Sequence, residues 1–449
     1  MRVALGLTVG AAVVLAAFVG NGNAASPASC GKLLPPAQGV YFGVMPGWEF
    51  SLPSYDDVAD PNVVRTFESY TGRKVAFAPW SISWHERLTF PRAAVIALWR
   101  AGYVPQVRVF TFPVQDYAPS APPPSQYPGP ITSSGVAAGK FDDELGEFAR
   151  AARATNIPIS FDYNPEMDSA HPWGGRFDGG GTPTSYGDPT WPDGPEHFRD
   201  AYRRIVTIFR EAGATNVTFF FQPNTPAGYV EGSYYPPWER YRRYYPGDEY
   251  MDWLGLSVYA EPKFQVLPNE SFEDKLAFPD QPGYEGPYAE ITALGAKPLS
   301  INELGLYNMP SEEAKARWAL DASSVLTSGR YARIGAVNWW AQNKGQGTGY
   351  DAYPNTSLVF LNGFRAAFNQ PFFDAQARFS GDCRPLKVAR VSVRRGVLSW
   401  RAVPNASAYE VWRGSKRLAR TSRTLWRVGH APGRYRVRGV NIAGYGPFS

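Results

Sequence analysis

The sequence predicts an α/β protein: an eight-stranded (β/α)8 TIM barrel followed by a small all-β, immunoglobulin-like sandwich. Short apolar runs closed by turn residues occur eight times, and helical patterns lie between them, which predicts the barrel. After Cys383 the pattern changes to alternating apolar and polar residues, which predicts the sandwich. With 449 residues, the chain is long enough for both.

The eight apolar runs are nearly continuous, as expected for parallel strands that are covered on both faces. These runs are residues 39–46, 74–82, 103–112, 157–164, 216–224, 251–259, 298–305 and 334–342. The clearest helical patterns end near Gly or Asn, which is a common stop signal for a helix. They cover residues 61–72, 90–102, 141–156, 195–213 and 311–329, and the weakest pattern follows the sixth run.

The N-terminus has the pattern of a secretory signal. Arg2 supplies the positive start, residues 3–20 are apolar, and residues 22–24 are small or polar, like a cleavage site. An uncleaved N-terminal anchor is the alternative, because the apolar stretch approaches the length that spans a membrane. We therefore expect residues 1–24 to be a signal peptide and the protein to be secreted, either extracellular or attached to the cell surface.

Cys30 and Cys383 are the only cysteines, which excludes a disulfide-rich scaffold and a multi-cysteine metal site. They bracket one large block, so a bond between them would tie its ends together in an oxidising compartment. Lipidation of Cys30 is the rival explanation, although residues 27–29 make a poor lipoprotein signal. The chain also lacks an HExxH motif, a P-loop and a GxGxxG fingerprint, so we expect no metal and no cofactor.

The last 66 residues, which we take as a second domain after a barrel domain at 30–383, are strongly basic. They hold 13 Arg and 2 Lys against Glu410 alone, a net charge of +14 in a chain whose total is +5. This charge predicts adhesion to an anionic cell-surface polymer. A spacer whose arginines only keep it soluble is the alternative, and nucleic acid is the weakest candidate because an exported protein seldom meets it.

Two glutamates lie where an apolar run gives way to a loop. Glu166 follows the fourth run, and Glu303 lies in the seventh. Side chains at the carboxyl ends of barrel strands point into the mouth of the barrel. A pair of carboxyl groups there is what most glycosidases use to break a glycosidic bond. For one glutamate taken alone, a salt bridge or a solvated position on the rim is the usual explanation.

The first block resembles glycoside hydrolase family 26, a family of β-mannanase-type, retaining (β/α)8 hydrolases. The resemblance covers residues 38–370 and is carried by motifs that occur in the family's order. They are the segments 141–149, 165–168 with Trp173, 245–259, 298–305 and 338–340, of which 245–259 is the most specific. The second domain resembles a short fibronectin type III module, through patterns such as Leu398-Ser399-Trp400 and Asn441-Ile442-Ala443-Gly444-Tyr445-Gly446.

The resemblance implies that Glu166 is the general acid/base and Glu303 the nucleophile, with their carboxyl groups about 5 to 5.5 Å apart. It also implies that Tyr259 hydrogen-bonds Glu303 and favours its ionised form. The neighbours Pro165 and Met167, together with Trp173, predict an apolar setting that favours the protonated form of Glu166.

Three residues depart from the family's pattern. Pro165 stands where the family usually has the His that helps to hold the acid/base, and Asp168 stands where Asn is usual. Asp162 stands where Arg is common. We expect an extra acid near Glu166 to raise its pKa by like-charge repulsion, or to reject anionic sugars. These departures leave both essential carboxylates in place, but they leave the substrate open.

Aromatic and amide side chains are the candidates for binding sugar. Trp173, Trp339 and Trp340 would stack under a sugar ring, and we expect one of the adjacent pair to pack into the barrel instead. Asn224, at the end of the fifth run, would contact a hydroxyl, or else cap a helix or stabilise a turn.

The resemblance implies a secreted endo-β-glycanase that acts as a monomer on a polysaccharide, with β-1,4-mannan as the first candidate. The same mechanism would serve mixed-linkage glucan, β-1,3-xylan or an exopolysaccharide. A non-catalytic glycan-binding protein is the alternative from a different class.

Overall fold

The computed structural model describes eleven stretches of the chain. They are residues 30–46, 59–112, 129–169, 171–183, 185–225, 237–260, 271–277, 284–307, 309–342, 351–429 and 433–449. The signal peptide expected at 1–24 lies outside the described residues.

Eight parallel strands form a closed barrel in chain order, as the sequence predicted. They are β2 (Tyr41–Pro46), β3 (Phe77–Ser83), β4 (Val104–Phe110), β5 (Ile159–Tyr163), β6 (Val217–Phe221), β7 (Trp253–Ala260), β8 (Leu299–Leu306) and β9 (Ile334–Ala341). The barrel closes where β2 pairs with β9. Almost every strand residue is buried, which explains why the strands appear in the sequence as continuous apolar runs.

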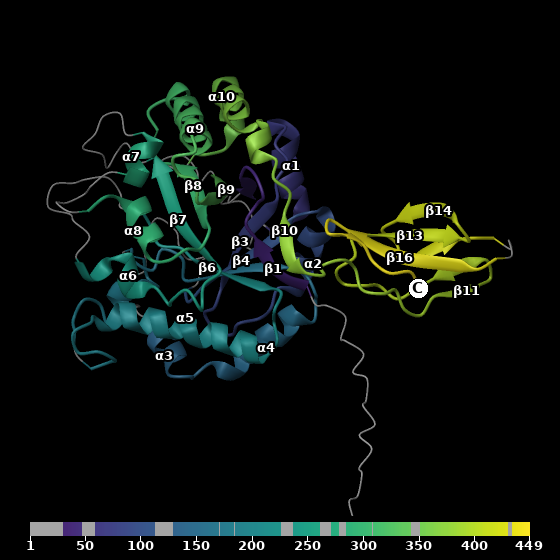
Figure 1. The fold of residues 1–449 in the computed structure, drawn as a ribbon, viewed down its shortest axis with the longest axis horizontal. Coiled ribbons are helices and arrows are strands. Elements are labelled where there is room, and N and C mark those ends of the chain that lie inside the picture. The colour runs from purple at the N-terminus through teal and green to yellow at the C-terminus, as the bar shows by residue number, and fades with distance from the viewer. Residues whose placement is uncertain are drawn as a thin grey trace, which may run out of the picture.

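Helices surround the barrel (Figure 1). They are α1 (Pro61–Thr71), α2 (Arg92–Ala101), α3 (Ser133–Ala137), α4 (Asp142–Arg153), α5 (Asp193–Glu211), α6 (Tyr241–Tyr244), α7 (Phe272–Ala277), α8 (Pro287–Ala293), α9 (Glu312–Thr327) and α10 (Leu358–Phe368). Asp60 caps the start of α1 and Gly72 ends it in a left-handed conformation, while Ser311 caps α9. Two short helices, α7 and α8, follow β7, which explains the weak pattern there. None of the helices described is long and apolar enough to cross a membrane.

A small antiparallel sheet lies against the amino-terminal end of the barrel. It pairs β1 (Cys30–Leu34) with β10 (Arg378–Gly381), and a disulfide joins Cys30 to Cys383. The Trp253 Nε1 donates to the Leu33 carbonyl at 3.2 Å, at the first residue of β7. The start and the end of the barrel domain therefore meet at the end of the barrel opposite the carboxyl ends of the strands.

The C-terminal residues form a separate all-β module with its own core (Figure 1). One antiparallel sheet has three strands, β11 (Ser392–Arg394), β12 (Val397–Ser399) and β15 (Leu425–Arg427). The other has four, in the order β14 (Lys416–Thr421), β13 (Ala408–Arg413), β16 (Tyr435–Asn441) and β17 (Gly444–Tyr445). The module contacts α2, where Trp99 Nε1 donates to the Asn405 carbonyl at 2.9 Å. Its likeness to fibronectin type III stays a prediction.

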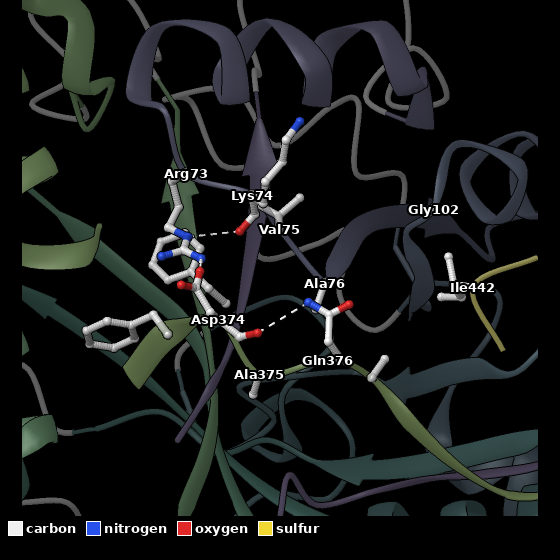
Figure 2. Close-up of a pocket in the computed structure, with 12 residues that line it drawn as sticks. Arg73, Lys74, Val75, Ala76, Gly102, Asp374, Ala375, Gln376 and Ile442 are labelled. Carbon is white, nitrogen blue, oxygen red and sulfur yellow. Dashed lines mark hydrogen bonds and ion pairs between the residues drawn. The ribbon is translucent and has the colours of Figure 1, made fainter. Parts of the chain in front are cut away.

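A small pocket lies where the barrel meets the module (Figure 2). Arg73, Lys74 and Asp374 line it on the barrel side, and Ile442 reaches it from the module. Ala76, which also lines it, directly precedes β3, so the pocket lies at the amino-terminal end of the barrel. Neither predicted catalytic glutamate borders this pocket.

Candidate active site

Glu166 lies just after β5 in a turn with unusual backbone geometry. Its φ is 60° and that of Asn164 is 43°, both in the left-handed region that favours glycine. Such a conformation costs about 1–3 kcal/mol and persists only where the surroundings hold it. Here the Glu166 N–H donates to the Gln222 carbonyl at 2.7 Å, and the Asn164 side chain bonds Thr111. The turn therefore fixes the Glu166 carboxylate relative to the end of β6.

Glu303 lies in β8, and the strand register is irregular on both sides of it. The β7–β8 pairing shifts between Leu256 and Ser257, and the β8–β9 pairing shifts between Ile301 and Leu304. In a regular strand, adjacent residues point to opposite faces. In β8, however, Asn302 and Glu303 both bond the Gln222 side chain, each at 3.0 Å. The irregularity thus re-aims two adjacent polar side chains toward one place.

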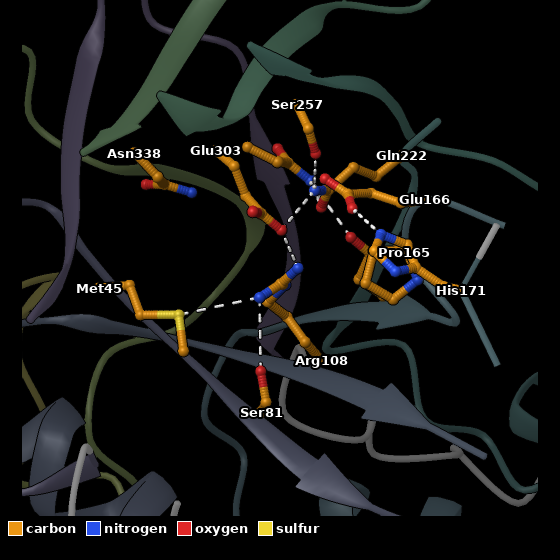
Figure 3. Close-up of polar contacts among 12 residues, drawn as sticks. Met45, Ser81, Arg108, Pro165, Glu166, His171, Gln222, Ser257, Glu303 and Asn338 are labelled. Atoms are coloured by element: carbon orange, nitrogen blue, oxygen red, sulfur yellow. Dashed lines mark hydrogen bonds and ion pairs between the residues drawn. The ribbon is translucent and has the colours of Figure 1, made fainter. Parts of the chain in front are cut away.

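Three donors hold the buried Glu303 carboxylate, and Figure 3 labels Arg108 and Gln222 among them. Arg108 Nη2 and Gln222 Nε2 both donate to Oε1, the second at 3.0 Å. The Tyr259 hydroxyl donates to Oε2 at 2.5 Å, which is the contact that the sequence predicted. Charge-assisted bonds of this kind are about twice as strong as neutral ones. Glu303 is therefore fixed in position by side chains from β4, from β7 and from the residue that follows β6.

Glu166 and Glu303 belong to one network. Gln222 Nε2, which contacts Glu303, also donates to Ser257 Oγ at 2.8 Å. The Glu166 N–H donates to the Gln222 carbonyl at 2.7 Å, and Ser257 helps to lower the pKa of Glu166. Gln222 and Ser257 therefore lie between the two carboxylates, as Figure 3 shows. The sequence predicted the two glutamates but not these two linking residues, because neither belongs to a recognisable local motif.

His171 is the immediate partner of Glu166. Its Nε2 lies 2.7 Å from Glu166 Oε2. The imidazole stacks on Trp173, with ring centroids 4.6 Å apart and planes 15° apart, and Trp173 Nε1 donates to the Pro165 carbonyl at 2.7 Å. A histidine therefore holds Glu166 although Pro165 occupies the position where the family has one. Sequence reasoning missed His171 because it lies five residues later, in a proline- and glycine-rich loop.

Arg108 supplies a guanidinium to the site. The family pattern has its arginine at another position, that of Asp162. Asp162, which stands where the family commonly has Arg, is directly opposite Arg108 on the neighbouring strand β4. The Arg108 guanidinium also lies over the rings of Trp340 and Phe110, at 4.7 and 5.2 Å. Burial raises the pKa of Asp162 well above its ordinary value, and Arg108 only partly opposes this. The sequence signal for this residue was that Arg108 is the one charged residue in the apolar run 103–112.

The pKa values of the two glutamates are shifted in the directions opposite to those expected from sequence. Burial pushes the pKa of Glu166 upward, but the hydrogen bond and charge of His171, together with Ser257 and the charge of Arg108, outweigh it, so the pKa lies below its ordinary value. Burial raises the pKa of Glu303, with a contribution from the Glu166 charge, against the opposing effects of Arg108 and Tyr259. Burial does favour the protonated form of Glu166, as expected, but the expected net direction was wrong because its partner in space is a histidine.

Asp168 does not produce the upward shift that was expected for Glu166. Burial raises the pKa of Asp168 itself well above its ordinary value, and its Oδ1 accepts the Asn224 N–H at 2.9 Å. Asn224 Nδ2 donates to Ser169 Oγ at 3.1 Å. Of the two roles considered for Asn224, the described contacts are therefore those of a residue that stabilises a turn.

The two adjacent tryptophans of β9 lie in different surroundings. Trp339 is fully buried, donates to the Ala352 carbonyl and packs against Phe360, Phe364 and Phe368 of α10. It therefore faces the helices and is not a platform for sugar. Trp340 lies beside Arg108 and keeps 8% of its surface exposed, and Trp173 keeps 9%. Among the predicted platforms, these two contact the partners of the glutamates, Trp340 beside Arg108 and Trp173 beside His171. The described residues contain no group of three metal-ligating side chains.

Comparisons with known proteins give distant similarities. No family model matches the sequence. Over 313 residues, 69% of this chain, the sequence is 22% identical to endoglucanase H of Acetivibrio thermocellus, and the match spans 30% of that protein. The chain therefore covers less than a third of its curated relative.

Solved structures similar to this chain include β-mannanases of glycoside hydrolase family 26. The catalytic domain of an endo-β-1,4-mannanase from Bacillus sp. JAMB-750 is 17% identical, with a TM-score of 0.47, and the match covers 75% of this chain and 86% of that one. A modular endo-β-1,4-mannanase from Cellulomonas fimi is 18% identical, with a TM-score of 0.45, and the match covers 91% and 92% of the two chains.

Proposed function

We propose that the protein is a secreted, retaining endo-β-glycanase whose first candidate substrate is β-1,4-mannan. The observation that carries this proposal is the placement of Glu166, just after β5, and Glu303, in β8, which both hydrogen-bond Gln222 at the carboxyl ends of the barrel strands. Two carboxyl groups that share one site are what a double displacement at a sugar carbon requires.

In the first step, a Glu303 oxygen attacks the anomeric carbon while the bond from that carbon to the glycosidic oxygen breaks. Glu166 gives its proton to the departing oxygen, so the leaving sugar departs as an alcohol. Arg108, Gln222 and Tyr259 orient the Glu303 carboxylate for this attack. The sugar is then held as an ester of Glu303.

In the second step, Glu166 is ionised and takes a proton from water. The water oxygen bonds to the anomeric carbon, and the bond from that carbon to Glu303 breaks, which returns Glu303 as a carboxylate. Two inversions give net retention of configuration.

The first step needs a proton on Glu166, and the His171 contact can accommodate it. A neutral imidazole with its proton on Nδ1 accepts a hydrogen bond at Nε2, where Glu166 Oε2 lies 2.7 Å away. When the imidazole is charged, it instead favours the carboxylate, which is the form that the second step uses.

The resemblance of the sequence motifs to family 26 supports mannan as the substrate. The endoglucanase named among the relatives favours a β-glucan as the second candidate. Trp173 and Trp340, beside the glutamates, give sugar C–H faces apolar surfaces to stack on.

The stereochemistry and position of cleavage test the proposal. The enzyme is incubated with mannan, glucomannan, lichenan and β-1,3-xylan, and nascent reducing ends are followed by NMR before they equilibrate. We expect β-anomers first and a fall in viscosity that precedes complete conversion to small sugars. An α-anomer as first product would contradict retention, and absence of new reducing ends from every polymer would leave only glycan binding.

His171→Gln tests how the acid/base is tuned. The variant keeps a hydrogen-bond donor but loses the charge that helps to lower the pKa of Glu166, so that pKa should rise. Because the acid form of Glu166 is needed, the alkaline limb of the kcat/KM profile should move to higher pH. His197→Gln is the matched control, since His197 contacts Asp178 instead of Glu166. The alkaline limb of its kcat/KM profile should stay at the wild-type pH. An unmoved limb in His171→Gln would contradict this role.

A further inference from the structure

The outward face of the four-stranded sheet in the C-terminal module is made of arginine and aromatic side chains. Its inward residues Tyr409, Val411 and Val437 form the module core. The residues between them therefore point outward. Across the strands, Trp412 lies between Arg417 and Arg436, and Glu410 lies between Arg420 and Arg438. Together with Tyr445 and Phe448, whose rings contact these side chains, we call Trp412, Arg417, Arg420, Arg436 and Arg438 the arginine face.

One buried acid fixes part of the arginine face. Glu410 is fully buried, although it lies on the outward side. It accepts hydrogen bonds from Arg417 Nη1 at 2.9 Å, from Arg438 Nη2 at 2.7 Å and from Trp412 Nε1 at 3.2 Å. Burial alone would raise the pKa of Glu410, but the arginine bonds outweigh it and the pKa is lowered. The ionised carboxylate thus anchors two guanidinium groups from below.

Aromatic rings hold the arginines from the sides. The Arg438 guanidinium lies 4.2 Å from the Tyr445 ring centroid and 4.8 Å from that of Phe448. Arg436 lies 4.4 Å from the same Phe448 ring, and its Nη2 donates to the Gly414 carbonyl. Ordering long side chains before a ligand arrives reduces the entropy that binding costs. The cations of the arginine face are therefore preorganised.

The charge of the arginine face is largely uncompensated. Glu410 is the one acid among residues 384–449, against 15 Arg and Lys side chains, and two arginines already share it. Arg420 and Arg417 are exposed, and Tyr445 keeps 47% of its surface exposed. A ligand on this face would therefore meet fixed positive charge and an open aromatic ring together.

We propose that the arginine face binds an anionic polysaccharide, one whose sugars carry carboxylate or sulfate groups. A guanidinium donates two parallel hydrogen bonds to such groups. The neighbouring rings offer surfaces for the C–H faces of the same sugars. A lipid surface fits less well, because Trp412 and Phe448 are partly covered by the arginines and are not free to insert.

This inference goes beyond the proposed function and is independent of it. The arginine face belongs to the module, which touches the barrel through Trp99 and Arg100 of α2. Loss of hydrolysis at the glutamates would leave it intact, and loss of this face would leave the glutamate network intact.

Electrophoresis of the full chain through native gels tests the proposal. Polygalacturonate is the anionic probe, and dextran is the neutral one. We expect polygalacturonate to retard the protein and dextran not to. Raising the salt from about 50 to 300 mM should weaken the binding at least about tenfold, because exposed charges are screened. Retardation that persists unchanged at high salt, or equal retardation by dextran, would overturn the proposal.

Two double variants distinguish binding at the arginine face from a general effect of the module's net charge. Arg420→Ser with Arg436→Ser should weaken binding about tenfold, since it removes two guanidinium groups that would pair with the anionic sugars. The matched control, Arg394→Ser with Arg427→Ser, removes the same charge from the outward side of the three-stranded sheet and should change the affinity less than about twofold. Equal weakening by both pairs would show a diffuse charge effect and overturn the proposal.

A third variant and two competing ligands complete the test. Tyr445→Ser should weaken binding without changing the salt dependence, because it removes a ring and no charge. Tighter binding to phosphatidylserine vesicles or to a single-stranded oligonucleotide than to polygalacturonate would overturn the polysaccharide assignment. Thermal unfolding of each variant establishes that the module is folded.

Discussion

Glu303→Ala should lower kcat on the best polysaccharide by at least about 10³-fold, which corresponds to roughly 4 kcal/mol of lost transition-state stabilisation. The reason is that no other side chain in the network is placed to form the ester with the sugar. Glu313→Ala is the matched control: this glutamate is exposed at the start of α9, and its loss should leave kcat unchanged. Initial rates of reducing-end release provide the measurement.

A small anion separates a missing nucleophile from a misfolded site. In Glu303→Ala, azide can enter the space left by the carboxylate and attack the same face of the sugar, giving an α-glycosyl azide from a β-linked substrate. Glu303→Gln fills that space and keeps groups for Tyr259 and Gln222 to contact, so it should be equally slow and not rescued. Failure of azide to accelerate a correctly folded Glu303→Ala, or formation of the β-azide, would contradict the assigned role.

The barrel was predictable because its strands carry their signal locally. A parallel strand covered on both faces must be apolar along its length, so each appears as a run that turn residues close. The seventh run was predicted at 298–305, and β8 occupies Leu299–Leu306. The position of Glu303 within that strand then placed it near the barrel mouth.

The partners of the glutamates were not predictable in the same way. Gln222, Ser257 and Arg108 meet Glu303 or Glu166 because of strand order and the shifted register around β8. A one-residue shift changes which side chains face inward, and no local pattern encodes it. The pKa directions were wrong for a related reason: they were taken from neighbours along the chain, whereas the decisive contact of Glu166 is with His171 across a loop.

The departures from the family pattern also look different once the contacts are known. Pro165 stands where the family usually has a histidine, and in this chain His171 contacts the Glu166 carboxylate. Asp162 stands where Arg is common, and Arg108 lies opposite it on β4. A histidine and an arginine are thus present in the site at sequence positions that differ from the family's pattern.

Glu166→Ala should lower kcat/KM on polysaccharide by about 10²–10⁴-fold, the usual contribution of a positioned acid or base. The loss should depend on the leaving group. A 2,4-dinitrophenyl glycoside releases dinitrophenolate, which needs no proton to depart. The first step on this substrate should therefore stay close to the wild-type rate. The second step still lacks a base, so the ester of Glu303 should accumulate and appear as a burst of dinitrophenol. Stopped-flow absorbance measures both phases.

Asp168→Asn is the matched control for that experiment, because it changes a carboxyl on the same loop whose Oδ1 already accepts the Asn224 N–H. This variant should show the same dependence on leaving group as the wild type. In Glu166→Ala, azide should speed the second step and yield a β-glycosyl azide, since it attacks from the side where water enters. An α-azide would mean that the roles of the two glutamates are exchanged. Equal losses on good and poor leaving groups would mean that Glu166 orients the site and moves no proton.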